Sequence, residues 1–581
     1  MSIRAALTAA VLGLVTVAVP ASTAMAHPAT PTYTNPVSQP AADTFADPSI
    51  IRGHDGNWYA YGTSDPLHAG ETTPHFVPIL RSGDLVHWTY AGDAFTAANR
   101  PAWATPTAGL WAPDIRYLGG RYVLYYTVTD TTLNDGDDSA IGVATAPTPL
   151  GPWTDSGRPI IAPRPAPGGG FLWTFDPAEL TDAQGHRWLY YGSYFGGIFT
   201  VPLSADGLTA AGSPTQITID NRYEGAYVVR RGGWYYLFAS AANCCAGPTT
   251  GYSVFAGRSA SPTGPFVDRD GVSLLTSRVG GTPVIQPNGN KWVGTGHNAI
   301  VTDLAGQDWL VYHAIDRNQP YLNEPFGINR RPMLIDRLDW VHGWPTARAT
   351  DTPQPAPVTR PHQPAGRPAP RIADPRVGRL DRSASDEFNG NGLGAGWTWI
   401  RPDAQATVAN GVLSWPTEPA DLVGSGNNAG VLVRPAPRGD FVIETKLTID
   451  LGVDTVRNYE QAGLIVYADD DNFARLSQVA IWNTRQIEFG REIPYAGQTS
   501  YGGMVEGPPT PTIWLRLAHT FVAGEHHYRA GWSTDGRHWH WGGTWTFPGT
   551  ATPHIGLIAH GGNQPPVTAV FDYFRVYLGR R

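Results

Sequence analysis

Four acidic residues in the first half of the chain stand among apolar or aromatic neighbours, each shortly before a similar aromatic stretch. They are Asp47 in Ala-Asp-Pro-Ser, Asp114 in Trp-Ala-Pro-Asp, Asp176 in Phe-Asp-Pro and Glu224 in Tyr-Glu-Gly. Such neighbours desolvate a carboxyl group, which favours its protonated form. Several carboxyl groups that lie close together let one be charged while another is neutral at the same pH. The set therefore suits general acid–base chemistry.

A carboxylate beside a proline also caps turns, so any one of the four acids could be structural. Their shared placement favours the chemical interpretation, because each could occupy an equivalent inner-strand position directed at a common axis. Cleavage of a glycosidic bond needs such carboxyl groups on opposite sides of the bond. One donates a proton to the leaving oxygen, and the other attacks the sugar or activates water.

The aromatic stretch behind these acids recurs five times, at residues 56–61, 120–126, 186–191, 233–238 and 307–312. Each copy is a turn followed by aromatic and β-branched residues, which suit a half-buried strand. The repeat predicts blades of a β-propeller, and five copies predict five blades. Five unrelated strands of a β-sandwich are the alternative. A Gly-Pro-Trp or Gly-Pro-Phe corner follows two of the copies, at 151–153 and 264–266, and this favours the repeat.

The chain of 581 residues is too long for one hydrophobic core and predicts two or three domains. Charged residues make up only 15%, whereas Gly (67), Pro (52) and Trp (21) are abundant. This composition is typical of an all-β, turn-rich protein with aromatic surfaces that suit carbohydrate. The net charge of −8, without a basic run, argues against nucleic acid as a partner.

The N-terminus has the pattern of an export signal. Arg4, an apolar run over 5–19 and Ala24-Met25-Ala26 predict a secretory signal peptide over residues 1–26. A transmembrane anchor is the alternative, but the run is short and no second apolar stretch follows. We therefore predict a secreted, extracellular protein that does not contact a membrane. We also predict that it is a monomer.

The two cysteines, Cys244 and Cys245, are adjacent. Two cysteines are too few for a structural zinc site or for a framework of several disulfides. In an oxidising compartment they could form a vicinal disulfide, and two reduced buried thiols are the alternative.

The predicted organisation is a five-bladed β-propeller over residues 31–348, a Pro-rich linker over 349–378 and a β-sandwich, or jelly-roll, domain over 379–581. Crowded prolines favour an extended chain in the linker. After the linker in the sequence, stretches such as 441–447, 462–467 and 514–517 alternate apolar and polar residues, as strands of a two-sheet sandwich do. The predicted fold class is therefore all-β.

The boxes around the four acids, together with the Ser-Gly-Asp-Leu-Val-His-Trp stretch at 82–88, resemble glycoside hydrolase family 43 over roughly residues 31–345. The resemblance implies a five-bladed propeller that mostly hydrolyses arabinosides and xylosides with inversion. It makes Asp47 the general base, Glu224 the general acid, and Asp176 a third carboxylate that positions the acid and tunes its pKa. Asp114 belongs to a family motif but is not one of the three, and we interpret it as a structural residue or as one that supports the residues in contact with substrate.

The Cys244–Gly247 stretch, followed by residues 257–259 and 264–266, resembles the arabinan-cleaving members. In many of those, a histidine near the last blade binds a metal or an ordered water cluster. His297 in Gly-Thr-Gly-His is the matching residue, although the usual motif is Gly-Pro-Gly-His. His313 is the second candidate. The resemblance thus implies a structural Ca²⁺ or other cation near His297, with a satisfied polar histidine as the alternative. The predicted chemistry requires no cofactor.

Aromatic residues beside the carboxylates are the candidates for sugar binding. Trp111, Phe175 and Tyr223 either bind substrate or pack between blades. The second domain resembles the concanavalin-like modules appended to some family members, by its opening at 386–388 and its strand at 463–467. It could bind polysaccharide, shape the propeller's cleft or stabilise the propeller.

The predicted substrate is a plant cell-wall polysaccharide, arabinan or arabinoxylan. Endo-1,5-α-L-arabinanase and α-L-arabinofuranosidase activity both stay open, because the shape of the loops decides between them. β-Xylosidase activity is an alternative within the family. A non-catalytic secreted carbohydrate-binding protein is the alternative of another class, and the intact carboxylate trio argues against it.

Overall fold

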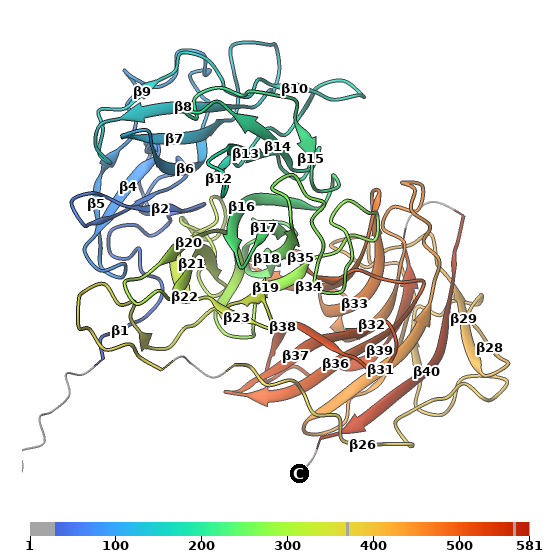
Figure 1. Ribbon diagram of the computed structural model, residues 1–581. Helices are drawn as coiled ribbons and strands as arrows, with labels where there is room; N and C mark the ends of the chain where they lie inside the picture. The colour runs from blue at the N-terminus through green and yellow to red at the C-terminus, as the bar shows by residue number, and fades with distance from the viewer. Residues whose placement is uncertain (1–29, 368–370, 562–564, 580–581) are drawn as a thin grey trace, which may run out of the picture.

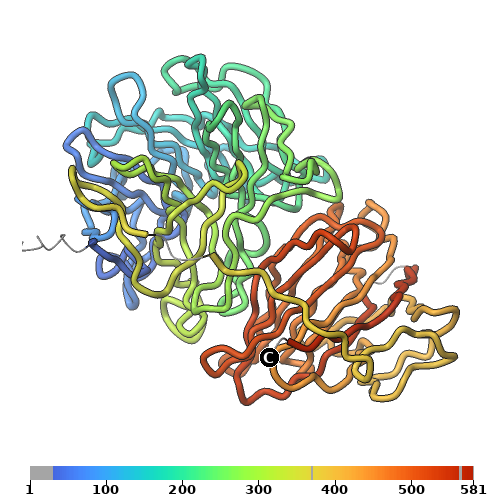
Figure 2. Tube along the Cα trace, turned by 60° about the horizontal axis from the view of Figure 1, so that its bottom comes forward, coloured from blue at the N-terminus to red at the C-terminus, as the bar shows by residue number. Residues whose placement is uncertain are grey.

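The computed structural model describes residues 30–367, 371–561 and 565–579. Their regular secondary structure is almost entirely β-strand, which confirms the predicted all-β class (Figure 1). The predicted signal peptide lies outside the described residues. The strands form two domains, and a single extended segment runs from one to the other (Figure 2). In the described part of the chain, no helix has the length and apolar character needed to cross a membrane.

The N-terminal domain contains five groups of strands, and each of the first three groups is an antiparallel sheet of four strands in chain order. The first group comprises β2 (Ser49–Arg52), β3 (Trp58–Tyr61), β4 (Pro78–Ser82) and β5 (Trp88–Asp93). The second comprises β6 (Leu110–Leu118), β7 (Arg121–Val128), β8 (Ala140–Ala146) and β9 (Thr154–Asp155). The third comprises β12 (Ala178–Thr181), β13 (Arg187–Tyr191), β14 (Phe199–Leu203) and β15 (Thr215–Gln216).

Two further groups share one seven-stranded sheet. The fourth group comprises β16 (Tyr223–Arg231), β17 (Trp234–Ala241), β18 (Ser253–Ser259) and β19 (Thr282–Ile285), and the fifth β20 (Trp292–Thr302), β21 (Asp308–Asp316) and β22 (Met333–Arg337). The parallel pair Ser253 and Thr295 joins them. The five aromatic repeats form the second strand of each group: β3, β7, β13, β17 and β21. Because the pairing merges the last two groups, the number of blades stays a prediction.

An N-terminal clasp, defined here as residues 35–45, closes the ring of groups by lying against β22. The backbone N–H of Val37 donates to the carbonyl of Met333 (3.0 Å), and that of Phe45 donates to Arg331 (2.9 Å). The Asn35 side chain accepts from the N–H of Ile335 (3.0 Å). The first group is thereby held against the fifth.

The C-terminal domain is a two-sheet sandwich, as predicted. One sheet has the order β28 (Thr407–Ala409), β29 (Val412–Pro416), β40 (Thr568–Leu578), β31 (Phe441–Thr448), β36 (Thr512–Val522), β37 (Glu525–Ser533), β38 (His540–Pro548), with β26 (Arg379–Leu380) on β40. The other has the order β27 (Thr398–Ile400), β30 (Val431–Pro435), β39 (His554–His560), β32 (Gln461–Asp469), β33 (Asn472–Ile481), β34 (Thr484–Tyr495), β35 (Gln498–Gly507). Alternate residues of both sheets, among them Trp415, Leu464 and Phe489, meet in one buried core.

The first part of the predicted linker lies on the propeller. Its short strand β25 (Gln354–Pro355) pairs with β1 (Thr32–Tyr33). Further on, the N–H of Val358 donates to the Asp303 carboxylate (2.9 Å). The linker is therefore extended, but it is anchored to the first domain over at least these residues.

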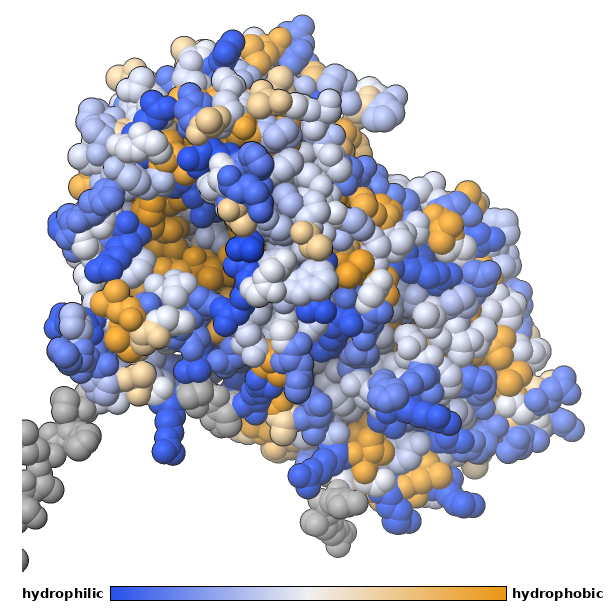
Figure 3. Space-filling view, viewed as in Figure 1, coloured by the Kyte–Doolittle hydropathy of each residue, from blue (hydrophilic) through white to orange (hydrophobic). Residues whose placement is uncertain are grey.

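The two domains touch through their backbones, and the space-filling view shows no gap between them on the face displayed (Figure 3). The short 3₁₀ helix η1 (Gly247–Thr249) and the glycine beyond it face β35. A Cβ on Gly251 would lie 1.9 Å from the carbonyl oxygen of Gly503. Ser500 donates to the carbonyl of Ala246 (3.0 Å). Only glycine at position 251 permits its backbone to approach Gly503 so closely.

We expect Gly251→Ala to force the domains apart and to lower the free energy of unfolding by about 1–3 kcal/mol, the usual cost of overpacking. Urea unfolding followed by tryptophan fluorescence measures this. Gly168→Ala is the matched control, because a Cβ there meets nothing within 4 Å. An unchanged midpoint for Gly251→Ala would show that the two backbones do not meet in this way.

Candidate active site

In each of the five groups, a residue with left-handed backbone lies within the first strand or two residues before it. These residues are Asp47 (φ 53°), Ala112 (φ 43°), Asp176 (φ 57°), Gly225 (φ 60°) and His297 (φ 48°). Left-handed backbone is uncommon for residues other than glycine and marks functional sites when it is held by its surroundings. Asp47, Asp176 and the neighbour of Gly225, Glu224, are the three acids predicted to be catalytic.

A partner from the preceding group holds each of these five N–H groups. Thr63 accepts from Ala112 (2.9 Å), Thr127 from Asp176 (3.1 Å), the Asp176 carboxylate from Gly225 (2.9 Å), Ser240 from His297 (2.9 Å) and His313 from Asp47 (3.2 Å). The last contact returns from the fifth group to the first. This cyclic pattern supports five blades and brings the three acids to the same end of the ring.

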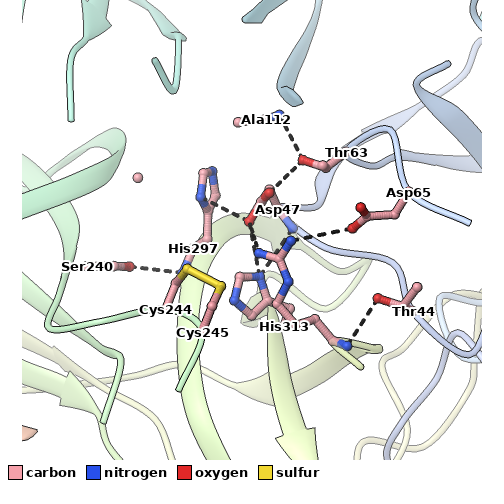
Figure 4. A network of polar contacts seen from close by, with 12 residues as sticks. Thr44, Asp47, Thr63, Asp65, Ala112, Ser240, Cys244, Cys245, His297 and His313 are labelled. Atoms are coloured by element: carbon pink, nitrogen blue, oxygen red, sulfur yellow. Dashed lines mark hydrogen bonds and ion pairs between the residues drawn. A yellow bond between two sulfur atoms is a disulfide. The ribbon is translucent and has the colours of Figure 1, made fainter. Parts of the chain in front are cut away.

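Asp47 lies at the centre of a polar network (Figure 4). Its Oδ1 is 3.2 Å from Nδ1 of His313, 3.3 Å from Nδ1 of His297 and 3.4 Å from Nη1 of Arg331. Its Oδ2 accepts a hydrogen bond from Thr63 (2.5 Å). The side chain is therefore fixed from both sides.

This network keeps Asp47 ionised. Burial by itself raises the pKa of the Asp47 carboxyl, but Arg331, followed by His297 and His313, more than offsets it, and the pKa lies well below its ordinary value. Burial lowers the pKa of His313 to about 4 and also lowers that of His297, so both rings are neutral near pH 7. Arg331 thus supplies the lasting positive charge beside Asp47.

The pKa values of Glu224 and Asp176 are raised, whereas that of Asp47 is lowered. Burial raises the pKa of Glu224, although hydrogen bonds from Tyr252 and from Ser193 (2.9 Å) partly oppose it. Burial, followed by the charges of Glu224 and Asp47, raises the pKa of Asp176 well above its ordinary value. Two interacting buried carboxyl groups retain a proton between them more readily than isolated ones. The site therefore combines one ionised carboxylate with a pair that holds a proton.

Sequence reasoning did not predict Arg331 or its second partner, Asp65. Nη2 of Arg331 lies 3.4 Å from Asp65. Burial raises the pKa of Asp65 to about 6, although Arg331 opposes the rise. Both residues come from loops between the second and third strands of their groups. The only signal in the sequence is the Ser-Asp-Pro motif at 64–66, which resembles the motifs around the predicted acids and contains Asp65.

Asp114 does not occupy the position equivalent to the other acids, which corrects the expectation of four acids in phase. It stands two residues beyond the left-handed Ala112, after an irregularity in β6. Its carboxylate is almost fully buried and accepts from Ser49 (3.3 Å), Arg116 (2.9 Å) and the N–H of Glu179 (2.7 Å). These contacts join the first three groups, so its role is structural.

The three predicted sugar-binding residues separate into two classes. The Trp111 side chain is 41% exposed, and its ring lies 6.1 Å from that of the half-buried Phe175. Tyr223 is fully buried and donates to the carbonyl of Gly280 (2.6 Å). The prediction for Tyr223 is therefore wrong, because its ring packs in the core against Phe255.

Cys244 and Cys245 are joined by a disulfide, one of the two alternatives left open by the sequence. The loop that carries them is bound to the next loop of the ring, because the carbonyl of Cys245 accepts from Asn329 (3.4 Å) and Asn329 in turn accepts from the N–H of Gly247 (2.9 Å). These hydrogen bonds anchor the loop between β17 and β18 to the loop between β21 and β22.

The surroundings of His297 supply few ligands for a cation. Among the described residues, no group of three or more His, Cys, Asp or Glu side chains is arranged to hold a metal. The side-chain oxygen of the adjacent Asn298 is buried without a hydrogen-bonding partner in the described part of the chain. Ca²⁺ takes six to eight oxygen ligands, so a cation here would depend mostly on water. The cation near His297 stays a prediction.

A family model described as "Glycosyl hydrolases family 43" matches residues 33–345, and one described as "Beta xylosidase C-terminal Concanavalin A-like domain" matches residues 385–577. The extracellular endo-α-(1→5)-L-arabinanase 1 of Bacillus subtilis is 33% identical and aligns over 52% of this chain and 86% of its own. The extracellular exo-α-(1→5)-L-arabinofuranosidase ArbA of Cellvibrio japonicus is 32% identical over 52% of this chain and 85% of its own. The structure of the Cellvibrio cellulosa α-L-arabinanase with arabinohexaose aligns at 30% identity over 52% and 95% of the two chains (TM-score 0.44). With more than half of its length matched by the family model, the chain belongs to glycoside hydrolase family 43.

Proposed function

We propose that this protein is a secreted, inverting glycoside hydrolase that cleaves α-L-arabinofuranosidic bonds in arabinan or in other arabinose-containing plant polysaccharides. The observation that carries the proposal is the opposite direction of two pKa shifts at one end of the ring. That of Asp47 is lowered and that of Glu224 is raised. The extracellular arabinan-degrading relatives support the substrate class and the export.

In the proposed reaction Glu224, in its protonated form, donates its proton to the glycosidic oxygen as the bond to the anomeric carbon breaks. Asp47, in its ionised form, takes a proton from a water molecule, whose oxygen attacks the anomeric carbon from the opposite face. The configuration at that carbon is inverted. Both carboxyl groups return to their starting states when the products leave and protons exchange with solvent.

Asp176 acts through Glu224 in this scheme. It accepts the N–H of Gly225, the residue that follows the acid, and thereby fixes the backbone beside it. Its interaction with Glu224 helps to retain a proton on the pair. The exposed Trp111 and the half-buried Phe175 provide aromatic faces for the sugar, as aromatic rings do in carbohydrate sites.

The experiment that tests the proposal compares linear arabinan, an aryl α-L-arabinofuranoside and an aryl β-xyloside as substrates. We expect hydrolysis of the arabinose-containing substrates, with the inverted anomer appearing first in proton NMR spectra. A retained anomer would contradict the role of Asp47 as a base. No hydrolysis of any substrate, together with binding of sugar, would indicate a carbohydrate-binding protein instead.

β-Xylosidase activity is the second candidate, and one observation favours it. The C-terminal domain matches a model described from β-xylosidases over residues 385–577. Faster hydrolysis of the xyloside than of the arabinofuranoside would select this candidate. The acid–base scheme would be the same.

The activity is expected to depend on pH through Arg331. Asp47 must be ionised, so activity is lost as the pH falls through its lowered pKa. Glu224 must be protonated, so activity is lost as the pH rises through its raised pKa. Arg331 lowers the pKa of both groups. We therefore expect Arg331→Gln to move both limbs of the kcat/KM profile to higher pH.

Arg330→Gln is the matched control for this profile. Arg330 comes from the same loop but pairs with Asp43 (2.8 Å). Its variant should keep both limbs in place, and Arg331→Lys, which retains the charge, should move them less than Arg331→Gln does. Unmoved limbs in Arg331→Gln would show that its guanidinium does not set the charge state of Asp47.

A further inference from the structure

A row of aromatic rings leads away from the catalytic acids on the propeller. Trp111 lies 6.1 Å from Phe175, which precedes Asp176 in the chain, and Phe175 stacks on Trp173 (5.7 Å). Trp173 in turn lies 6.4 Å from both Tyr194 and Phe195. Trp111, Trp173 and Phe195 are each more than 40% exposed. Exposed rings in contact with one another form a continuous apolar surface of the kind that binds ligands.

The sandwich presents two more exposed rings, both on left-handed backbone. Tyr459 (φ 70°) is 47% exposed, Trp482 (φ 49°) is 45% exposed, and their ring centroids are 6.3 Å apart. Trp482 and Asn483 form the two-residue turn between β33 and β34, since Ile481 pairs with Thr484. Of the two, only Trp482 has positive φ, and a turn with positive φ at its first position alone favours glycine there. A bulky aromatic residue with positive φ is an outlier that points to function.

The same turn attaches the sandwich to the propeller beside the aromatic row. Asn483 donates to Asp220 (2.5 Å) and accepts from the side chain of Asn221 (2.8 Å). The N–H of Asn221 donates to the carbonyl of Tyr194 (2.6 Å). Through Asn221, the turn that carries Trp482 is therefore linked across the domain boundary to the loop that carries Tyr194 and Phe195.

We propose that Tyr459 and Trp482 of the sandwich extend the substrate groove of the propeller and bind sugar units of a linear, neutral pentose polysaccharide several units away from the cleaved bond. The inference rests on the proposed function, because the row begins at the catalytic acids. Aromatic rings flanked by side-chain amides recognise uncharged sugars, whose C–H faces lie on the rings and whose hydroxyls meet the amides. The sandwich would then act as a second wall of the groove.

The test measures binding in the full chain carrying Glu224→Gln, so that the sugar is not consumed. Isothermal titration calorimetry is carried out with linear arabino-oligosaccharides of increasing length, from the disaccharide upwards, and with a parallel series of xylo-oligosaccharides. We expect affinity to rise with length, and Trp482→Ala and Tyr459→Ala each to reduce the affinity for the longest oligosaccharides by about three- to tenfold. The affinity for the disaccharide measures the catalytic end of the groove.

Two further variants keep the result interpretable. Phe521→Ala removes a ring of the same domain that is 52% exposed and should leave the affinity at every length unchanged. Trp482→Gly relieves the strain of the left-handed backbone at this position, so this variant should unfold at the same temperature as the wild type or at a higher one. It should still bind long oligosaccharides more weakly than the wild type does. Equal affinity of wild type and the Trp482 variants for long oligosaccharides would overturn the proposal.

The outcomes separate this inference from the proposed function. Hydrolysis of arabinan with normal disaccharide binding, but without any effect of Trp482 or Tyr459 on long oligosaccharides, would overturn the extended groove alone. A length effect seen with the xylose series instead supports the groove and contradicts the arabinan substrate. Absence of hydrolysis and of disaccharide binding in both series would overturn the proposed function and the groove that depends on it.

Discussion

Glu224→Gln is expected to reduce kcat on linear arabinan by about 100- to 10,000-fold, the usual contribution of a general acid. The amide cannot donate the proton that the leaving sugar oxygen needs. It can still accept the hydrogen bond from Ser193, so the fold and the binding of substrate should persist. Initial rates on arabinan, with thermal unfolding measured in parallel, check both parts of the result.

The leaving group provides the sharper comparison for Glu224. An aryl arabinofuranoside with a good leaving group needs little protonation, so Glu224→Gln should hydrolyse it nearly as fast as the wild type does. The alkaline limb of the pH profile should also disappear on that substrate. Equal losses on arabinan and on the activated substrate would contradict the role of Glu224 as the acid.

Asp47→Asn is expected to reduce kcat by a similar or larger factor, at least about 1,000-fold, and to do so on every substrate. Attack by water is required whatever the leaving group is, and a neutral amide cannot take the proton from that water. The variant keeps the shape of the side chain and its contact with Thr63, so the loss should lie in kcat. Rates on arabinan and on the activated aryl arabinofuranoside measure it.

Asp43→Asn is the matched control, because Asp43 lies in the N-terminal clasp and pairs with Arg330 and His68 instead of Arg331. It should retain wild-type rates. A loss in Asp47→Asn that disappears with a good leaving group would reverse the assignment of acid and base. The two variants therefore test each other.

The sequence predicts the three acids because the features that place them are local. Each of Asp47, Asp176 and Glu224 lies in a short box in front of a repeated strand, and repeated strands put such boxes at one end of a ring. Asp114 has the same kind of box, but a break in the pairing of β6 moves it two residues along the strand and into the interior. A one- or two-residue change of register is invisible in a single sequence and decides where a side chain lies.

The residues that the sequence does not predict depend on contacts between distant parts of the chain. Arg331 meets Asp47 across 284 residues. Tyr223 has the composition of a sugar-binding residue, and only the packing of its ring beside Phe255 shows that it is buried. The approach of Trp482 to the aromatic row depends on how the two domains dock, which no local pattern encodes.

The N-terminal clasp carries a consequence for biosynthesis. The segment that bears Asp47 leaves the ribosome early, whereas β22, against which the clasp lies, and Arg331 are made only at the end of the propeller. Contacts of such long sequence separation form late in folding. A nascent chain therefore holds the carboxylate without the guanidinium that keeps it ionised. The hydrolase becomes competent only when the early-made segment around Asp47 contacts β22 and Arg331, which are made late.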